Sequence, residues 1–195
     1  MKARLCQLLL LTLGITPLIQ AQTQKGTHLI GAQVGNIVFS QRDNVGNSIQ
    51  LKPTYGYFVM NQLAVGLAIP LYYYNGGIPK GSYQVTQIGL TPFIRYYIGP
   101  SLIKPFLSVA AGFQKNKGVG GGSPTSIDYT WGYSAGGGVA FFVTKSVSLD
   151  LAANYTGIGS RDYYTLDSYA QNGLTTGVVD AININLGFQV YFGNK

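Results

Sequence analysis

The sequence predicts an all-β fold: an eight-stranded antiparallel up-and-down transmembrane β-barrel. Three observations support this prediction. Apolar and polar residues alternate along most of the chain, and charged residues make up only 10% of the sequence. Short connections alternate with long ones between the alternating segments. A typical soluble domain has about 25% charged residues. The 195 residues are enough for one domain of this kind.

Residues 1–21 are predicted to be a secretory signal peptide. A positively charged start with Lys2 and Arg4 precedes a short apolar stretch, which ends just before polar residues. The stretch is too short for a bilayer-spanning helix, which needs roughly 20 apolar residues. An uncleaved anchor is the alternative. Cys6, the only cysteine, lies in this segment, so the barrel domain, residues 22–195, is expected to have no disulfide and no Cys metal site.

Alternating segments follow, and each is expected to form one strand of the barrel. Period-two alternation places successive side chains on opposite faces of a sheet. The last segment shows this most clearly, because apolar residues take every second position from Ile182 to Phe192. No convincing helical periodicity appears after residue 22. The expected strands cover residues 27–38, 47–60, 63–74, 83–98, 104–115, 127–143, 146–158 and 177–192.

The connections between these strands fall into two classes. Asn61-Gln62, the link from Gly99 to Ile103, and Thr144-Lys145 are tight turns. Alternate connections of an up-and-down barrel lie on the same rim, so one rim has short turns and the other long loops, as in bacterial transmembrane barrels. The Gly-rich run 118–122 is expected to be a flexible surface loop, since it lacks the context of a phosphate-binding loop. The longer connections are 39–46, 75–82, 116–126 and 159–176.

Each expected strand has one aliphatic or aromatic face and one small, polar face. Two closed barrels can produce this pattern. A secreted soluble lipocalin-like barrel, binding a small apolar ligand, would point the apolar face inward and carry charged residues outside. A membrane barrel would point that face toward lipid, and small side chains would fill its narrow eight-stranded interior. The scarcity of charge, with no Glu at all, favours the membrane barrel.

Aromatic residues gather near the expected strand ends. Their position fits the girdles that flank the lipid-facing band of membrane barrels. Tyr is also simply a good strand former, which is the alternative explanation. The residues concerned are Tyr72, Tyr73, Tyr74, Tyr96, Tyr97, Tyr129, Trp131, Phe141, Phe142, Tyr191 and Phe192.

The closing strand contains the pattern polar-x-Gly-x-x-apolar-x-aromatic, with Asn185, Gly187, Val190 and Phe192 at the fixed positions. With the internal stretches TPFIRYYIG and KPFLSVAAGF, this pattern resembles the small outer-membrane β-barrel family of Gram-negative bacteria, which includes the OmpA and OmpX transmembrane domains. The resemblance implies an integral outer-membrane location, contact with outer-membrane lipid, and recognition of the closing strand by the barrel assembly machinery. One departure is that Gly193-Asn194-Lys195 follow the final aromatic residue.

Four charged residues are candidates for the barrel interior. Strand parity points Lys52, Arg95 and Asp150 inward, and places Asp128 inward nearer the long-loop rim. Arg95 and Asp150 lie at similar distances from short turns, so they are expected at similar depth. Two interpretations are open: an ion pair that fills the lumen, or a polar network that gates a small pore.

Catalysis and nucleic-acid binding find little support. The only histidine is His28, no Glu is present, and no spacing indicates a catalytic triad, so we predict that the protein is not an enzyme and has no metal or cofactor. A lipid A-modifying outer-membrane enzyme remains an alternative. The net charge of +7 reflects scarce acid rather than a basic run, which argues against nucleic acid.

Any specific function is expected to depend on the long loops. The longest expected loop is rich in Tyr, Ser, Asn and Gly, a composition suited to adaptable binding. Its candidate contact residues are Arg161, Tyr163, Tyr164 and Tyr169. A passive exposed loop would have the same composition. The sequence therefore predicts a structural, adhesive or marginally permeable barrel, with any extracellular ligand unidentified.

Overall fold

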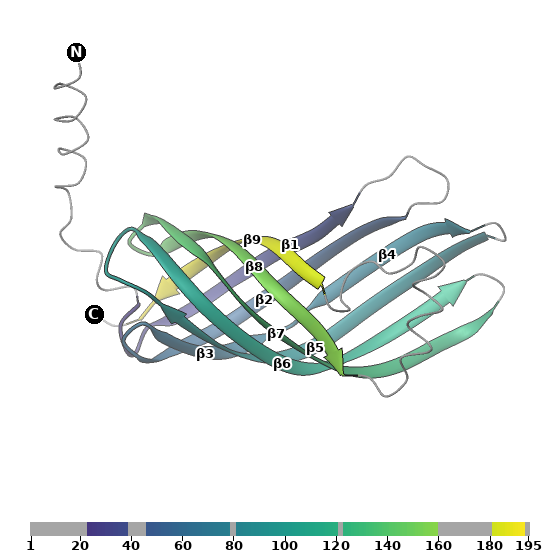
Figure 1. Ribbon diagram of the computed structural model, residues 1–195, viewed down its shortest axis with the longest axis horizontal. Coiled ribbons are helices and arrows are strands. Elements are labelled where there is room, and N and C mark those ends of the chain that lie inside the picture. Colours follow the sequence, from purple (N-terminus) through teal and green to yellow (C-terminus); the bar gives the residue numbers. More distant parts are fainter. Residues whose placement is uncertain (1–22, 39–45, 79–80, 121–122, 160–180, 194–195) are drawn as a thin grey trace, which may run out of the picture.

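The computed structural model describes residues 23–38, 46–78, 81–120, 123–159 and 181–193. These residues form nine strands in one antiparallel sheet that closes on itself (Figure 1). The strands are β1 (His28–Val38), β2 (Asn47–Met60), β3 (Leu63–Ala68), β4 (Leu71–Ile78), β5 (Gly81–Tyr97), β6 (Ile103–Gly120), β7 (Ser123–Thr144), β8 (Val147–Gly159) and β9 (Ala181–Phe192). Within the described ranges, no helix has the length and hydropathy needed to span a membrane.

The nine strands make a ring of eight, as predicted. β3 and β4 lie end to end, because both pair with β2 and both pair with β5. Their register is continuous, with Thr54 opposite Ala68 and Leu51 opposite Leu71. Pro70, which lies between the two strands, has no N–H to donate and so interrupts the ladder. The ring closes where β1 pairs with β9, from His28 opposite Phe192 onward.

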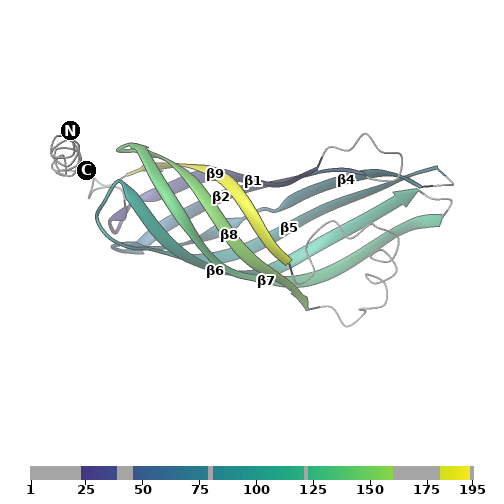
Figure 2. The same ribbon diagram turned by 45° about the horizontal axis from the view of Figure 1, so that its top comes forward.

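The wall is taller on one side than on the other. β6 and β7 stay paired from Ile103 to Gly120, whereas the described parts of β7 and β8 pair as far as Trp131 and Gly159 (Figure 2). The expectation of a flexible loop at the Gly-rich run was wrong for its first residues, Gly118 to Gly120, which belong to β6. Their backbone groups bond to β5 and β7, so the extended hairpin continues through glycines that lack strand propensity of their own.

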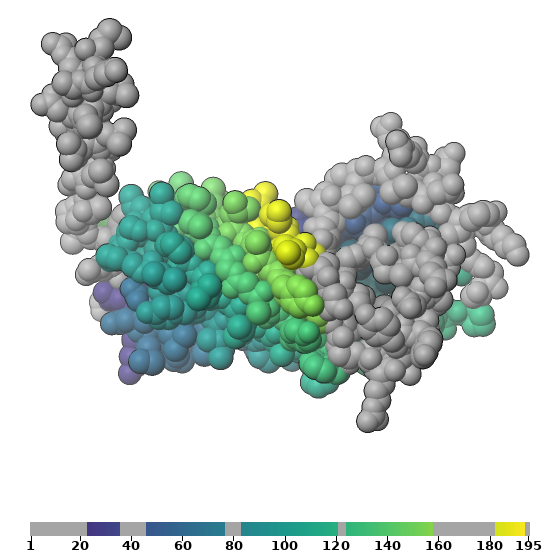
Figure 3. Space-filling model, in the orientation of Figure 1, coloured from purple at the N-terminus to yellow at the C-terminus, as the bar shows by residue number. Residues whose placement is uncertain are grey.

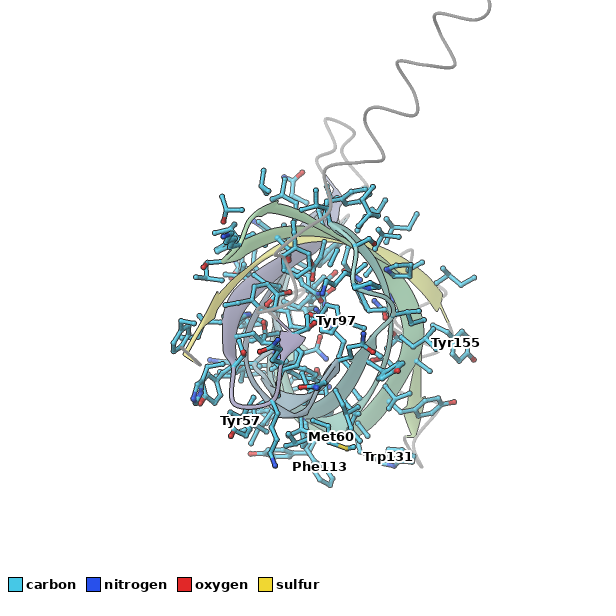
Figure 4. The ribbon with its side chains drawn as sticks, turned by 90° about the vertical axis from the view of Figure 1, so that its left-hand side faces the viewer. Tyr57, Met60, Tyr97, Phe113, Trp131 and Tyr155 are labelled. Carbon is cyan, nitrogen blue, oxygen red and sulfur yellow. The ribbon has the colours of Figure 1, made fainter. Side chains whose placement is uncertain are left out.

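Most of the large aliphatic side chains on the strands point outward. Large apolar side chains exposed on the wall include Leu107, Leu149 and Leu186. Figure 3 shows the wall in space-filling form, and Phe113, Trp131 and Tyr155 project away from the barrel in the end-on view of Figure 4. The soluble-barrel alternative required these side chains to point inward and is therefore wrong. A fold with this outer surface is stable only where lipid surrounds it.

Candidate functional site

An ion pair crosses the barrel interior between strands that are not neighbours. A guanidinium nitrogen of Arg95 on β5 lies 2.9 Å from a carboxylate oxygen of Asp150 on β8, and the two residues are 6% and 2% exposed. β6 and β7 separate these strands in the ring. The predicted meeting of Arg95 and Asp150 therefore occurs, and it occurs across the lumen.

Hydrogen bonds link this pair to two tyrosines and a serine. Arg95 donates to the hydroxyl of Tyr97 at 3.2 Å, and Ser148 donates to Asp150 at 2.7 Å. The Tyr97 and Tyr191 hydroxyls lie 3.1 Å apart, and those of Tyr191 and Ser148 lie 3.2 Å apart. Because Arg95 only donates and the serine proton goes to the carboxylate, donation runs from Tyr97 to Tyr191 to Ser148. These bonds lead from the Arg95 cation to the Asp150 anion, and the ion pair between the two closes the cycle.

Aromatic rings fill the space around the cycle. They come from β2, β5, β6, β7 and β9, and neighbouring ring centroids lie between 5.1 and 6.5 Å apart. The Arg95 guanidinium lies 4.4 Å from the ring centroid of Phe106, a cation–π contact. We use the name plug for a set of buried side chains. It consists of Arg95, Asp150 and Ser148 together with the rings of Phe58, Tyr97, Phe106, Phe142 and Tyr191. Its rings are nearly inaccessible to solvent, so they are packed inside the lumen.

The segment before β1 covers the short-turn rim beneath the plug. Residues 23–27 bond to β2 through Gly26 N–H to Phe58 C=O and Phe58 N–H to Thr27 C=O. The Lys104 ammonium donates to the Thr23 hydroxyl at 3.0 Å and lies 5.4 Å from the Phe142 ring centroid. Lys104 is only 1% exposed, and within the described ranges its ammonium contacts the Thr23 hydroxyl and the Phe142 ring.

Toward the long-loop rim the interior is polar and contains smaller side chains. We call this region the polar half. Its hydrogen bonds mostly join adjacent strands, as between Gln87 and Gln114 or from Asn116 to Thr130 at 3.2 Å. Lys52 points into it, as predicted, and is partly buried. Its side chain makes no hydrogen bond or ion pair with the described part of the chain.

Asp128 requires a correction. Its strand parity is that of the interior, as predicted, but its side chain is exposed. The reason is that the described part of β8 ends at Gly159, opposite Trp131, so Asp128 lies on the part of the β6–β7 hairpin that extends beyond the described ring. The carboxylate is therefore not an interior charge.

The predicted insertion motif divides between the two faces of β9. Asn185 is buried in the lumen, Gly187 faces Gln33 of β1, and Val190 and Phe192 point outward. Recognition of this motif stays a prediction. Arg161, Tyr163, Tyr164 and Tyr169 lie outside the described residues, as does the predicted signal peptide.

Sequence reasoning missed most of the plug. Each of the adjacent aromatic pairs Tyr96-Tyr97, Phe141-Phe142 and Tyr191-Phe192 has one ring outside and one inside. The expected girdle therefore holds only the outer member of each pair. The signal was available, since neighbours on a strand point to opposite faces. The contact of Lys104 with Thr23 had no such signal.

His28 and the acidic residues show no catalytic or metal-binding cluster in the described ranges. His28 lies on the outer face, with a ring nitrogen 2.8 Å from the Tyr55 hydroxyl and its ring stacked on Phe192. Asp150 lies inside the lumen, so the wall separates the two. The described residues contain no group of three or more His, Cys, Asp or Glu side chains placed to hold a metal ion.

Comparison with known proteins points to one family. The family model for the outer membrane protein beta-barrel domain matches residues 7–192. No curated protein sequence matches the chain. Similar solved structures include OprG of Pseudomonas aeruginosa, with a TM-score of 0.55 at 13% identity, covering 90% of this chain and 99% of that one. The N-terminal barrel of Pseudomonas aeruginosa OprF gives 0.52 at 13% identity (86% and 98% covered), and Neisserial surface protein A gives 0.51 at 18% (87% and 98%). At these identities the likeness concerns the fold.

Proposed function

Because the chain belongs to the outer membrane protein beta-barrel domain family, we propose that it is an outer-membrane barrel that conducts no ions and anchors its long loops in the membrane. The observation that supports this most directly is the ion pair between Arg95 and Asp150, which joins opposite walls inside a cluster of rings. A lumen crossed by bonded, buried side chains supports a barrel without a continuous water path. Of the two interpretations of these charges, the filled lumen fits the geometry better than a gated pore.

The segment 23–27 gives a second barrier. It covers the short-turn mouth through Thr23, whose hydroxyl accepts from Lys104 and whose carbonyl accepts from the Gln62 N–H at 2.6 Å. A solute that entered from this side would have to displace both bonds before it reached the plug.

We assign the long-loop rim to the cell exterior and the short-turn rim to the periplasm. This orientation follows the pattern of bacterial outer-membrane barrels, which have short periplasmic turns and longer extracellular loops. In the same proposal the signal peptide, residues 1–21, directs export, and the closing strand is read by the barrel assembly machinery. Adhesion through Arg161, Tyr163, Tyr164 and Tyr169 is the loop function that the composition favours, and the role is structural or adhesive rather than catalytic.

Planar-bilayer recording tests the closed lumen. The wild-type barrel, inserted and shown to be folded by heat-modifiable migration on a detergent gel, is expected to give no stepwise current above a detergent blank. The matched variant is Arg95→Ala with Asp150→Ala, which removes the crossing pair without leaving one charge alone. This variant is expected to give current steps. Regular stepwise conductance of the wild type would refute the proposal.

Surface labelling tests the orientation. An epitope inserted between residues 165 and 166 is expected to be reached by antibody on intact cells. The same epitope placed in the Asn61-Gln62 turn is expected to be reached only after the outer membrane is permeabilised. The reverse result would place the long loops in the periplasm.

A further inference from the structure

The outer wall has two charged side chains on its described strands, and both are lysines. Lys115 and Lys117 occupy successive outward positions on β6 and are exposed. Neither side chain makes a hydrogen bond or an ion pair within the described ranges. The exposed Asp128 sits opposite Asn116, on the other face of the hairpin. Among the described residues, two cations without an acidic partner therefore project from strands whose outward side chains are otherwise uncharged.

The height of these lysines matches a lipid headgroup region. The outward residues of β6 from Ile103 to Phe113 are uncharged, and Lys115 is the next outward position. Residues 103 to 113 cover about 34 Å at about 3.4 Å per residue, and a tilt of about 45° reduces this to about 24 Å across the bilayer. The lipid-facing band of such barrels is about 25 Å tall. Lys115 therefore lies where the hydrocarbon ends.

Aromatic and apolar side chains surround the lysines on their lipid side. Tyr129 is opposite Lys115 in the register, and its ring centroid lies 5.9 Å from the Lys115 ammonium. Phe113 and Tyr129 are each 76% exposed. Trp131, opposite Phe113, also projects outward from the wall, as Figure 4 shows. An amphipathic ring beside an ammonium is the arrangement expected at the boundary between acyl chains and headgroups.

We propose that Lys115 and Lys117 form a docking site for the anionic phosphate headgroup of a lipid in the leaflet at the long-loop rim. Two residues apart on one strand, the side chains leave the wall about 7 Å from each other, so both ammonium groups reach one headgroup. Each basic residue near an anionic membrane surface strengthens association by about fivefold. Phe113 and Trp131 contact the acyl chains of the same lipid, which distinguishes it from a soluble phosphate.

The single tryptophan provides the assay, because Trp131 is adjacent to the site and is the only Trp in the chain. The barrel is reconstituted in phosphatidylcholine bilayers that contain a brominated lipid, either phosphatidylglycerol or phosphatidylcholine. Bromine quenches indole fluorescence on contact, so quenching reports which lipid occupies the site. For the wild type, the relative binding constant of phosphatidylglycerol over phosphatidylcholine is expected to be about fivefold or more at low salt.

The test variant is Lys115→Gln with Lys117→Gln, and the matched control is Lys145→Gln in the turn at the opposite rim. The double variant is expected to lose the preference, with a relative binding constant near one, while the control retains it. Equal quenching of the wild type by the two brominated lipids would overturn the proposal, and so would a preference that the double variant keeps.

Two further measurements keep the test decisive. Quenching by brominated phosphatidylcholine must be the same in all three proteins, which shows that Trp131 is at the same depth. If the double variant does not insert, a salt titration of the wild type replaces it. The preference for phosphatidylglycerol is then expected to fall toward one at 0.5 M NaCl, because screening is strong at that ionic strength. A preference that salt leaves unchanged would overturn the proposal.

Discussion

The two halves of the barrel interior are built on different principles. In the plug, the contacts join strands that are not neighbours, such as β5 to β8 through Arg95 and Asp150, and β5 to β9 through Tyr97 and Tyr191. In the polar half, most hydrogen bonds connect strands that the backbone ladder already joins, such as Gln87 to Gln114. The plug therefore adds long-range links to the ring, whereas the polar half mainly satisfies its own polar groups.

Because of this difference, we expect the two halves to contribute unequally to the stability of the barrel. A bond across the lumen resists any motion that widens the barrel, so the plug should carry much of the stability of the fold. A bond between neighbouring strands does not restrain the diameter of the ring, so substitutions in the polar half should lower the free energy of unfolding only slightly. Variants in matched positions of the two halves test this contrast.

The largest effect is expected from Arg95→Ala. The change leaves the Asp150 carboxylate buried without its cation, and removing one partner of a buried pair costs about 3–5 kcal/mol of the free energy of unfolding. Urea unfolding in lipid vesicles, followed by tyrosine and Trp131 fluorescence, measures the loss. The double variant Arg95→Ala with Asp150→Ala is expected to lose less than the single variant, because no buried charge is left alone. Equal losses would show that packing, not charge, governs the site.

The sequence predicted the wall better than its contents. Alternation fixed the strand faces, and short turns at Asn61-Gln62 and Thr144-Lys145 fixed the strand order, because both signals are local. Strand parity also predicted that Arg95 and Asp150 both point into the lumen. It could not show that Asp128 lies beyond the closed ring, since that depends on where a neighbouring strand, β8, ends. The link from Lys104 to Thr23 likewise depends on the path of a segment outside the ladder.

A glycine pair on β7 gives the next largest contrast. A Cβ at Gly138 would lie 2.3 Å from the Leu151 carbonyl oxygen and 2.7 Å from the Phe106 ring, while at Gly132 the nearest atom, the Gly157 carbonyl oxygen, is 3.2 Å away. We expect Gly138→Ala to lower the free energy of unfolding by about 1–3 kcal/mol, as overpacking does. Gly132→Ala should cost under about 1 kcal/mol in the same urea assay. A larger loss at Gly132 would contradict the contrast between halves.

Neighbouring tyrosines on β5 test the hydrogen-bond cycle. Tyr97→Phe removes the hydroxyl that accepts from Arg95 and bonds Tyr191, and is expected to cost about 1–2 kcal/mol. Tyr96→Phe removes an exposed hydroxyl that donates to Gln62 at 3.3 Å on the outer face, and should change stability by less than about 0.5 kcal/mol. Both keep the ring, so packing is unchanged. Equal effects in urea unfolding would mean that the cycle adds nothing.

Lys52→Ala should have the smallest effect on the free energy of unfolding. It tests most directly whether the polar half contributes little to stability. The Lys52 side chain has no hydrogen bond or ion pair with the described residues, so its removal leaves no buried partner unsatisfied there. Burial of its ammonium and, to a smaller extent, the like charge of Arg95 both disfavour the charged lysine in the folded barrel. Removing that repulsion favours the folded barrel, which opposes the loss of packing by the lysine stem. We expect the free energy of unfolding to change by less than about 0.5 kcal/mol. A loss comparable to that of Arg95→Ala would show that the polar half carries the fold as the plug does.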